Sequence, residues 1–336
     1  MIIKKHTTNY KYLGLHMLYQ RLPNDHTMKI IINSKLMSAR AGIIGEATVE
    51  EVFRKHDFPF NYNILHDVNL TSNGKFQIDT LFICQYFIVI LECKNIIGNL
   101  RFENDPPCLK RELDTGKKNT FESPEVQVDR NTFLLREWLN KHGLDIPIIG
   151  VIVFSSTKSI IMKAPDHTAV IYASSVPVYL RRLQRQKEYL SEAQMHEISQ
   201  KIKQLNQPYI PFPMCKKWEI DPAELINGVK CEKCGRFEMM KKSNGWNCLL
   251  CGNIDRFAHI FTVREWFALV SKNITNKECR RFLCIESHQL ASRILNSMNL
   301  SRKGKSNNTT YYVLEWDKLD NSLEGIDEKY SSLTLI

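Results

Sequence analysis

Apolar and polar residues between positions 41 and 156 form blocks that predict an ordered run of helices and strands. AGIIGEATVEEVFRKH (Ala41–His56) has apolar residues at helical spacing after a glycine-containing turn, so it predicts a helix. Three strand-like runs follow, NYNILHDVNL, FQIDTLFI and FIVILECKN, with a Ser72-Asn73-Gly74 turn after the first. We then expect a polar loop (Asn104–Ser123), a helix (Glu125–His142) and a strand buried on both faces, IPIIGVIVFSS. This order indicates a small α/β domain with a mixed sheet.

The segments that flank this block have other patterns. The first forty residues have a rough helical period that stops at Pro23. After the block, a charged helical stretch ends in PYIPFP, whose prolines indicate a linker. We therefore predict an N-terminal helical extension at 1–37, the α/β domain at 38–175, a helical linker at 176–214, a cysteine-rich segment at 215–256 and a basic helical domain at 257–336.

Composition narrows the class of protein. The 336 residues are 43% hydrophobic and 24% charged, which excludes wholesale disorder. The net charge of +10 favours a polyanionic partner, either nucleic acid or an anionic membrane surface. The longest apolar run, Thr80–Leu91, is shorter than the roughly 18 residues that a membrane span needs. The first residues have no apolar core for a secretory signal, so we expect a cytoplasmic protein without a membrane partner.

Charged residues lie on two neighbouring predicted strands. Asp79 lies on one strand, and Glu92 and Lys94 share a face of the next because they are two residues apart. If these strands pair as a hairpin, Asp79 comes beside Glu92. Two carboxylates in an apolar sheet must be protonated or bind a cation, and Mg²⁺ or Mn²⁺ suits oxygen ligands. The spacing alone also fits a surface ion pair, but the apolar run before Glu92 marks a buried strand, where an unpaired charge is costly.

The same segments resemble the nuclease-related domain (NERD) family, a branch of the PD-(D/E)xK nuclease superfamily. The matching runs are GIIGE (Gly42–Glu46), FQIDTLFI (Phe76–Ile83), ILECKNIIGNLRF (Ile90–Phe102) and ESPEVQVDRNTFLLREWL (Glu122–Leu139). The resemblance extends along the chain to bacillus-type proteins that combine this domain with a zinc-ribbon-like segment and a C-terminal tail. It implies a restriction-endonuclease-like mixed sheet flanked by helices.

The resemblance also implies roles for individual residues. The catalytic set would be the helix carboxylate Glu46, the central metal ligand Asp79, the second ligand Glu92, the catalytic lysine Lys94 and the downstream helix glutamine Gln127. Cys93 stands where an aliphatic residue is commoner, and it would offer only its backbone carbonyl to the metal. Ile78 stands where the superfamily name has proline. Without the resemblance, Glu46 and Gln127 would be interpreted as surface residues of helices.

Four cysteines have the spacing of a zinc site. Cys231, Cys234, Cys248 and Cys251 form two C-x₂-C pairs separated by thirteen residues, and a glycine follows each pair. Disulfides or free thiols are the alternative, which suits a reducing compartment poorly. We predict a structural Zn²⁺ in a zinc-ribbon-like segment. Its basic and aromatic residues can contact phosphates and a base, although basic ribbon faces are common: Lys233, Arg236, Lys241, Lys242 and Trp246.

The tail is basic and helical. Between Ser271 and Thr310 there are eight Lys or Arg residues and two Glu residues. The pattern predicts a helix capped by Thr275 or Asn276, a second helix capped by Ser287, and a hairpin, which together resemble a winged helix-turn-helix. Any basic two-helix hairpin looks similar, and Ser301–Asn308 equally fits a disordered loop. The candidate nucleic-acid-binding residues are Arg280, Arg281, Gln289, Arg293, Arg302, Lys303 and Lys305, and His288 and Ser292 lie on the same second helix.

Two functions of different classes follow. The first is a Mg²⁺- or Mn²⁺-dependent nuclease, a hydrolase of nucleic-acid phosphodiester bonds for which DNA is favoured over RNA as substrate, assisted in binding by the zinc ribbon and the tail. The second is a nucleic-acid-binding or regulatory protein on an inactive nuclease-like fold. The complete set of five catalytic candidates favours the nuclease. A membrane-associated scaffold has only the net charge in its favour.

Overall fold

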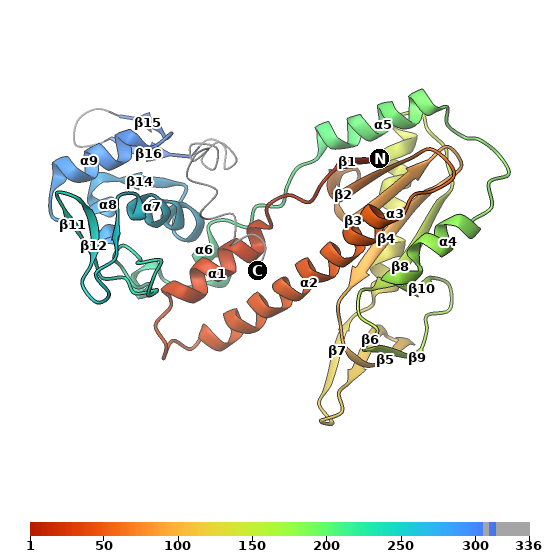
Figure 1. Cartoon of the computed structure of the whole chain (residues 1–336), viewed down its shortest axis with the longest axis horizontal. Coiled ribbons are helices and arrows are strands. Elements are labelled where there is room, and N and C mark those ends of the chain that lie inside the picture. Colours follow the sequence, from red (N-terminus) through yellow and green to blue (C-terminus); the bar gives the residue numbers. More distant parts are fainter. Residues whose placement is uncertain (305–308, 314–336) are drawn as a thin grey trace. The chain divides into compact units, whose positions relative to one another are not determined.

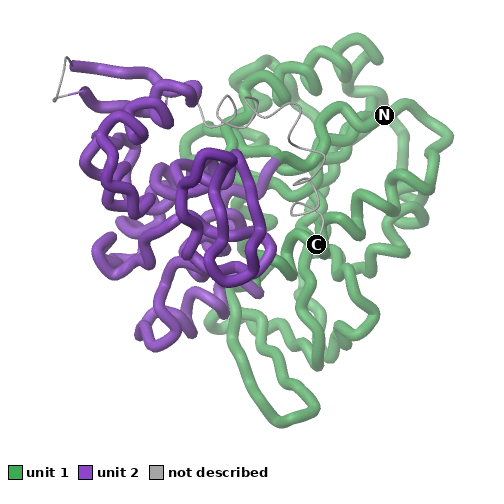
Figure 2. Tube along the Cα trace, turned by 60° about the vertical axis from the view of Figure 1, so that its left-hand side comes forward, with its two compact units in different colours: residues 1–7, 38–209 green, residues 8–37, 210–336 purple. Residues whose placement is uncertain are grey.

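The computed structural model describes residues 1–304 and 309–313, and the chain folds as two units (Figures 1 and 2). Unit 1 comprises residues 1–7 and 38–209, and unit 2 comprises residues 8–37 and 210–336. Helix α2 (Lys29–Lys55) begins in unit 2 and continues into unit 1. This division differs from the predicted one, because the predicted linker at 176–214 falls almost wholly in unit 1. In the described part of the chain, none of the helices is long and apolar enough to cross a membrane.

The centre of unit 1 is a six-stranded mixed sheet in the order β1-β2-β3-β4-β8-β10. Its strands are β1 (Ile2–Lys4), β2 (Tyr62–Thr71), β3 (Lys75–Cys84), β4 (Ile88–Lys94), β8 (Ile148–Phe154) and β10 (Ala169–Tyr172). The pairs β2–β3 and β3–β4 are antiparallel, whereas β1–β2, β4–β8 and β8–β10 are parallel. The prediction of a mixed α/β sheet is confirmed.

Helices cover both faces of this sheet, because alternate residues along each strand point to opposite sides. On one face, Leu81 and Ile83 of β3 pack in a core with α3 (Pro124–Asn140) and α5 (Glu192–Leu205). On the other face, Phe82 packs with α2 and α4 (Val176–Arg182), which follows the short 3-10 helix η1 (Ala173–Ser175). The predicted linker is therefore part of the fold, because the apolar stripes of α4 and α5 cover the sheet.

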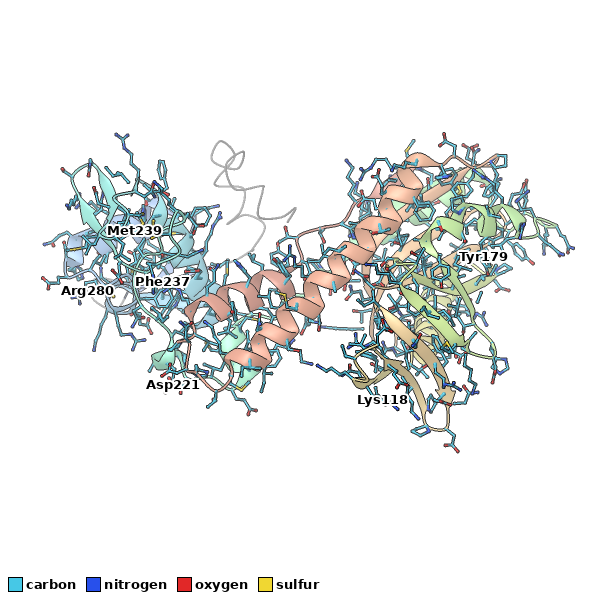
Figure 3. The ribbon with its side chains drawn as sticks, turned by 60° about the horizontal axis from the view of Figure 1, so that its bottom comes forward. Lys118, Tyr179, Asp221, Phe237, Met239 and Arg280 are labelled. Atoms are coloured by element: carbon cyan, nitrogen blue, oxygen red, sulfur yellow. The ribbon has the colours of Figure 1, made fainter. Side chains whose placement is uncertain are left out.

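A second, four-stranded sheet in unit 1 corrects the predicted polar loop at Asn104–Ser123. Its order is β7-β6-β5-β9, from β5 (Gly98–Asn104), β6 (Pro107–Glu112), β7 (Lys118–Glu122) and β9 (Ser159–Lys163). Leu100, Phe102 and Leu109 form its buried side, while exposed polar residues such as Lys118 face outward (Figure 3). A strand that buries only a few residues shows too little alternation to be distinguished from a loop.

The N-terminal prediction also needs correction. Residues 1–37 are not wholly helical, because Ile2–Lys4 form strand β1 and only Tyr10–Arg21 form α1. Helix α2 begins at Lys29 rather than after a turn at Gly42. Gly45 is inside the helix, where a Cβ atom would lie 2.9 Å from Cβ of Asn95. This glycine therefore permits close packing and not a turn.

Unit 2 combines helices with two small sheets. One sheet contains β11 (Met239–Lys242), β12 (Gly245–Cys248) and β13 (Ile254–Asp255), and the other contains β14 (Asn273–Thr275), β16 (Thr310–Tyr312) and β15 (Ser301–Lys303). The helices are α1, α6 (Met214–Trp218), η2 (Pro222–Glu224), α7 (Ala258–Leu269), α8 (Asn276–Leu283) and α9 (His288–Ser297).

A buried arginine holds this unit together. The guanidinium of Arg21 on α1 forms an ion pair with Glu265 on α7 and donates to the carbonyl oxygen of Ile226 at 2.6 Å. It also lies over the rings of Phe237 and Phe282, 4.4 and 4.3 Å from their centroids. A buried charge is tolerated only with such partners, so Arg21 fixes α1 against the rest of the unit.

Candidate active site

The register of β3 and β4 brings the candidate residues Asp79 and Glu92 together. Thr80 pairs with Leu91, so Asp79 follows in register beside Glu92. The backbone N–H of Cys93 donates to Oδ2 of Asp79 at 2.9 Å. The hairpin expected from the sequence is confirmed, and it fixes Asp79 at the end of β4.

Lys94 connects β4 to helix α3. Its Nζ donates to Oε1 of Glu92 at 2.6 Å and to Oε1 of Gln127 at 3.0 Å. Gln127 is half-buried against this lysine, so it is not a surface residue. Helix α3 approaches the sheet closely here because residue 150 on β8 is glycine, where a Cβ atom would lie 2.1 Å from Cγ1 of Val128.

Burial and mutual repulsion favour the neutral forms of the three carboxyl groups. Burial, with the charge of Asp79 as the next cause, raises the pKa of Glu46 to about 9 and that of Glu92 to about 8. Burial also raises the pKa of Asp79. Burial alone would lower the pKa of Lys94, but Glu92 and Asp79 outweigh it and raise that pKa. The positive charge of Lys94 therefore acts on all three acidic groups.

The donor set fits a hard divalent cation. Glu92 is 1% exposed, and its Oε2 atom is buried without a hydrogen-bond partner among the residues that the structure describes. An orphaned carboxylate oxygen beside a second carboxylate is suited to Mg²⁺ or Mn²⁺. Among the described residues, Glu46, Asp79 and Glu92 do not form a group in which one oxygen from each lies within 4.8 Å of the others. Burial raises the pKa of the Cys93 thiol, so this side chain stays protonated and is a poor metal ligand.

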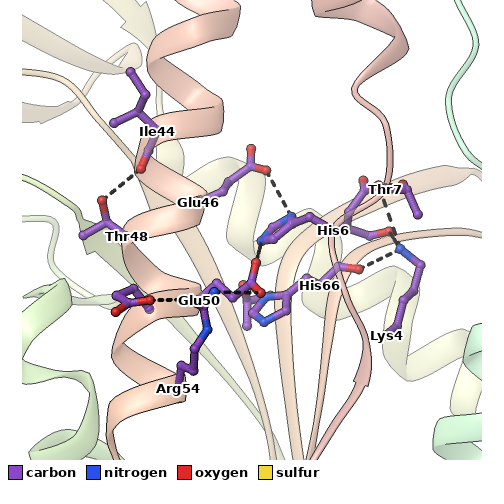
Figure 4. A network of polar contacts seen from close by, with 12 residues as sticks. Lys4, His6, Thr7, Ile44, Glu46, Thr48, Glu50, Arg54 and His66 are labelled. Carbon is purple, nitrogen blue, oxygen red and sulfur yellow. Dashed lines mark hydrogen bonds and ion pairs between the residues drawn. The ribbon is translucent and has the colours of Figure 1, made fainter. Parts of the chain in front are cut away.

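Helix α2 carries Glu46 to this end of the sheet, where it meets a residue that the sequence did not indicate. Nδ1 of His6 lies 3.6 Å from Oε2 of Glu46, and its Nε2 lies 3.7 Å from Oε2 of Glu50 (Figure 4). His66 of β2 stacks on His6, with ring centroids 4.5 Å apart. Sequence reasoning missed His6, Glu50 and His66, since they share no local motif and come together only through the β1–β2 pairing and the packing of α2.

The four predicted cysteines lie together in unit 2. Their sulfur atoms are all within 4.8 Å of one another, and the Cys231–Cys251 and Cys234–Cys248 distances are both 3.6 Å. These separations exceed the roughly 2.05 Å of a disulfide and match thiolates arranged around one Zn²⁺. The glycines after each pair, at 235 and 252, have φ of +73° and +69°. The cluster could therefore bind zinc through two tight turns.

The expectation that Trp246 contacts a base needs correction. Trp246 is 0% exposed, and its Nε1 donates to Nδ1 of His259 at 2.9 Å, so its ring cannot stack on a base. The tryptophan sits on β12 and forms part of the core of the unit. Its basic neighbours are all exposed: Lys233, Arg236, Lys241 and Lys242.

Helices α8 and α9 have the caps that the sequence predicted. Oγ1 of Thr275 accepts from the N–H of Glu278, and Oγ of Ser287 accepts from the N–H of Leu290. Asn276 joins the helices, because its Nδ2 donates to the carbonyl oxygen of His288 and to Oγ of Ser292, both at 2.9 Å. Ser292 is thus engaged within the helix pair.

The candidate nucleic-acid-binding residues of the tail differ in their exposure to solvent. Arg280 is half-buried, and its Nε donates to Oδ1 of Asn276 at 3.1 Å, so it supports the turn between the helices. The exposed candidates are Arg281, Gln289, Arg293, Arg302 and Lys303, with His288 beside them. Lys305 lies outside the described residues.

Residues 41–155 match the family model of the nuclease-related domain (NERD). This match covers the segment that carries Glu46, Asp79, Glu92, Lys94 and Gln127. Comparison with curated proteins and with solved structures gave no match.

Proposed function

We propose that the nuclease-related domain of this chain is a divalent-metal-dependent phosphodiesterase that cleaves DNA. The observation that carries the proposal is the position of Lys94, held between Glu92 and Gln127 next to Asp79. A structural ion pair has no need of a second carboxylate with a raised pKa or of an orphaned oxygen. The oxygen of Glu92 that is unpartnered within the described part of the structure instead offers a position where a cation could bind, beside the positive charge of Lys94.

Each side chain then has a distinct task. Mg²⁺ or Mn²⁺ bound by Asp79, Glu92 and the Cys93 carbonyl would lower the pKa of a bound water and stabilise negative charge on the phosphate. Lys94 stays protonated at neutral pH because the acidic groups raise its pKa, so it acts as a cation that holds a phosphate oxygen or orients the water. Gln127 fixes the direction of that ammonium group.

Unit 2 supplies a candidate nucleic-acid-binding surface. The order α7, β14, α8, α9, β15, β16 is that of a winged helix-turn-helix, in which the second helix of the pair enters the major groove. Gln289 and Arg293 on α9 are exposed for base-edge or phosphate contacts, and Arg302 and Lys303 lie on the hairpin that would form the wing. This order is the reason for proposing DNA rather than RNA, because the deep, narrow major groove of RNA does not admit such a helix.

The test is cleavage of labelled duplex DNA, single-stranded DNA and RNA with Mg²⁺, with Mn²⁺ and with chelator. Asp79→Asn and Lys94→Gln should each lower the rate by at least about 100-fold. Two matched controls are Asp114→Asn, at an exposed turn of the same unit, and Lys75→Gln, at an exposed position on the same strand as Asp79. Both control variants should cleave at the wild-type rate. Salt-sensitive DNA binding without cleavage by the wild type would instead identify an inactive nucleic-acid-binding protein.

A further inference from the structure

A second cluster of metal-ligand side chains lies in unit 1, next to Glu46. His6, Glu50 and His66 each offer a potential ligand atom, and these atoms all lie within 4.8 Å of one another (Figure 4). They come from three elements: the segment after β1, helix α2 and strand β2. We propose that they form a binding site for a divalent transition-metal ion, with Zn²⁺ as the probe.

The hydrogen bonding of each group leaves a ligand atom directed to the cluster. Nδ1 of His66 is 2.9 Å from Oγ1 of Thr80, whereas its Nε2 is buried and has no hydrogen-bond partner in the described part of the chain. Oε1 of Glu50 is 3.4 Å from Arg54, and Oε2 is the atom that faces His6. His66 is 0% exposed, so an unpaired imidazole nitrogen there is costly unless something binds it.

The chemistry and the dimensions suit zinc. Two imidazole nitrogens and one carboxylate form a ligand set that leaves a position for water. Ligands about 2.1 Å from a tetrahedral ion are about 3.4 Å apart, which the 3.7 Å between His6 and Glu50 approaches. Burial lowers the pKa of His6, and it lowers that of His66 to about 3, so both rings are neutral and keep their lone pairs at pH 7.

The surroundings hold the ligands in place. Nζ of Lys4, on β1, donates to the carbonyl oxygens of His66 and Asp67, both at 2.8 Å, and so anchors the segment that carries His6. Nδ1 of His6 faces Oε2 of Glu46, an oxygen acceptor that can orient the ring of a metal ligand. The proposal does not depend on whether the carboxylate centre cleaves DNA.

Zinc stoichiometry of the full chain tests the site. The wild type should retain one zinc at the four cysteines and a second at His6, Glu50 and His66. His6→Asn and Glu50→Gln should weaken binding of the second ion by more than about 100-fold, whereas Glu46→Gln should weaken it about 10-fold through the loss of ring orientation. The controls are Glu51→Gln, also an Arg54 partner on α2, and His56→Asn, an exposed histidine after α2, and both should retain the second ion.

Two results would overturn the proposal. One is a wild type that binds zinc only at the cysteines. The other is a second ion that Asp79→Asn removes and His6→Asn does not, since that ion would belong to the carboxylate centre. Anomalous scattering at the zinc edge gives an independent check, because a peak should lie beside the ring nitrogens of His6 and His66 and the carboxylate of Glu50.

Discussion

The raised pKa of Glu46 predicts an unusual pH dependence of stability, which Glu46→Gln should remove. The folded pKa is about 9 and the reference value is 4.5, so folding between these pH values takes up a proton. For an acid with a raised pKa, this stabilisation is complete below pH 4.5 and is lost as the pH rises towards 9. Each pH unit in this window costs the wild type about 1.36 kcal/mol. The glutamine variant has no proton to bind at this position, so its stability lacks this dependence.

The stability difference between the variant and the wild type should therefore change with pH. Between pH 5.5 and 7.5 the free energy of unfolding of the variant should rise by about 2.7 kcal/mol relative to that of the wild type. This value is the maximum, because one side chain binds one proton. The difference between two pH values cancels any effect of the substitution that does not involve a proton. Glu51→Gln serves as the control, because the Glu51 side chain is 42% exposed on the same helix.

Hydrogen exchange of the β4 amides, measured on zinc-loaded protein without added Mg²⁺, reports the opening of unit 1 separately from that of unit 2. A stability difference that is the same at both pH values would refute the reasoning, since Glu46 would then be ionised in the folded protein. Mg²⁺ should reduce the advantage of the variant if the cation draws protons from these carboxyl groups.

Three further perturbations test other parts of the molecule. Gly150→Ala should lower the free energy of unfolding by about 1–3 kcal/mol in urea titrations, because its Cβ would overlap Val128, whereas Gly74→Ala has no atom within 4 Å of the new Cβ. Cys234→Ser should remove the cysteine-bound zinc and unfold the ribbon while the amide exchange of β4 stays unchanged; zinc analysis and hydrogen exchange decide this. Arg293→Gln should weaken DNA binding and reduce the slope of log affinity against log salt by about 1 if the side chain contacts a phosphate.

The sequence predicted the elements whose apolar pattern is set by burial. Strands β3, β4 and β8 are buried in the central sheet, so their runs are unambiguous, and α3 shows a clear apolar stripe. The β5–β7 sheet was missed because its strands bury few residues and carry polar side chains on their open face. The start of α2 was misplaced because Gly42 and Gly45 normally indicate a turn, whereas packing against β4 overrides that preference here.

The candidate site was also predictable only in part. The residues that are close in the sequence were predicted, and those that are far apart in the sequence were not. Glu92 and Lys94 are two residues apart on one strand, and Asp79 is placed by a short hairpin, so local rules bring them together. Gln127 required the family pattern, because nothing local places α3 against Lys94. His6 meets its partners through the parallel pairing of Ile2 with Ile64, which no rule of spacing predicts.

Helix α2 explains why the two proposed sites of unit 1 are adjacent. Glu46 and Glu50 are four residues apart, so they lie one turn apart on the same face of the helix. Glu46 lies near Asp79 and Glu92, whose charges add to the effect of burial in raising its pKa. Glu50 lies near His66. His6 is at ion-pair distance from both glutamates. An ion bound at Glu50 would therefore act on Glu46 through a single imidazole ring. A zinc-dependent change in the pH profile of cleavage, absent in His6→Asn, would distinguish this coupling from two independent sites.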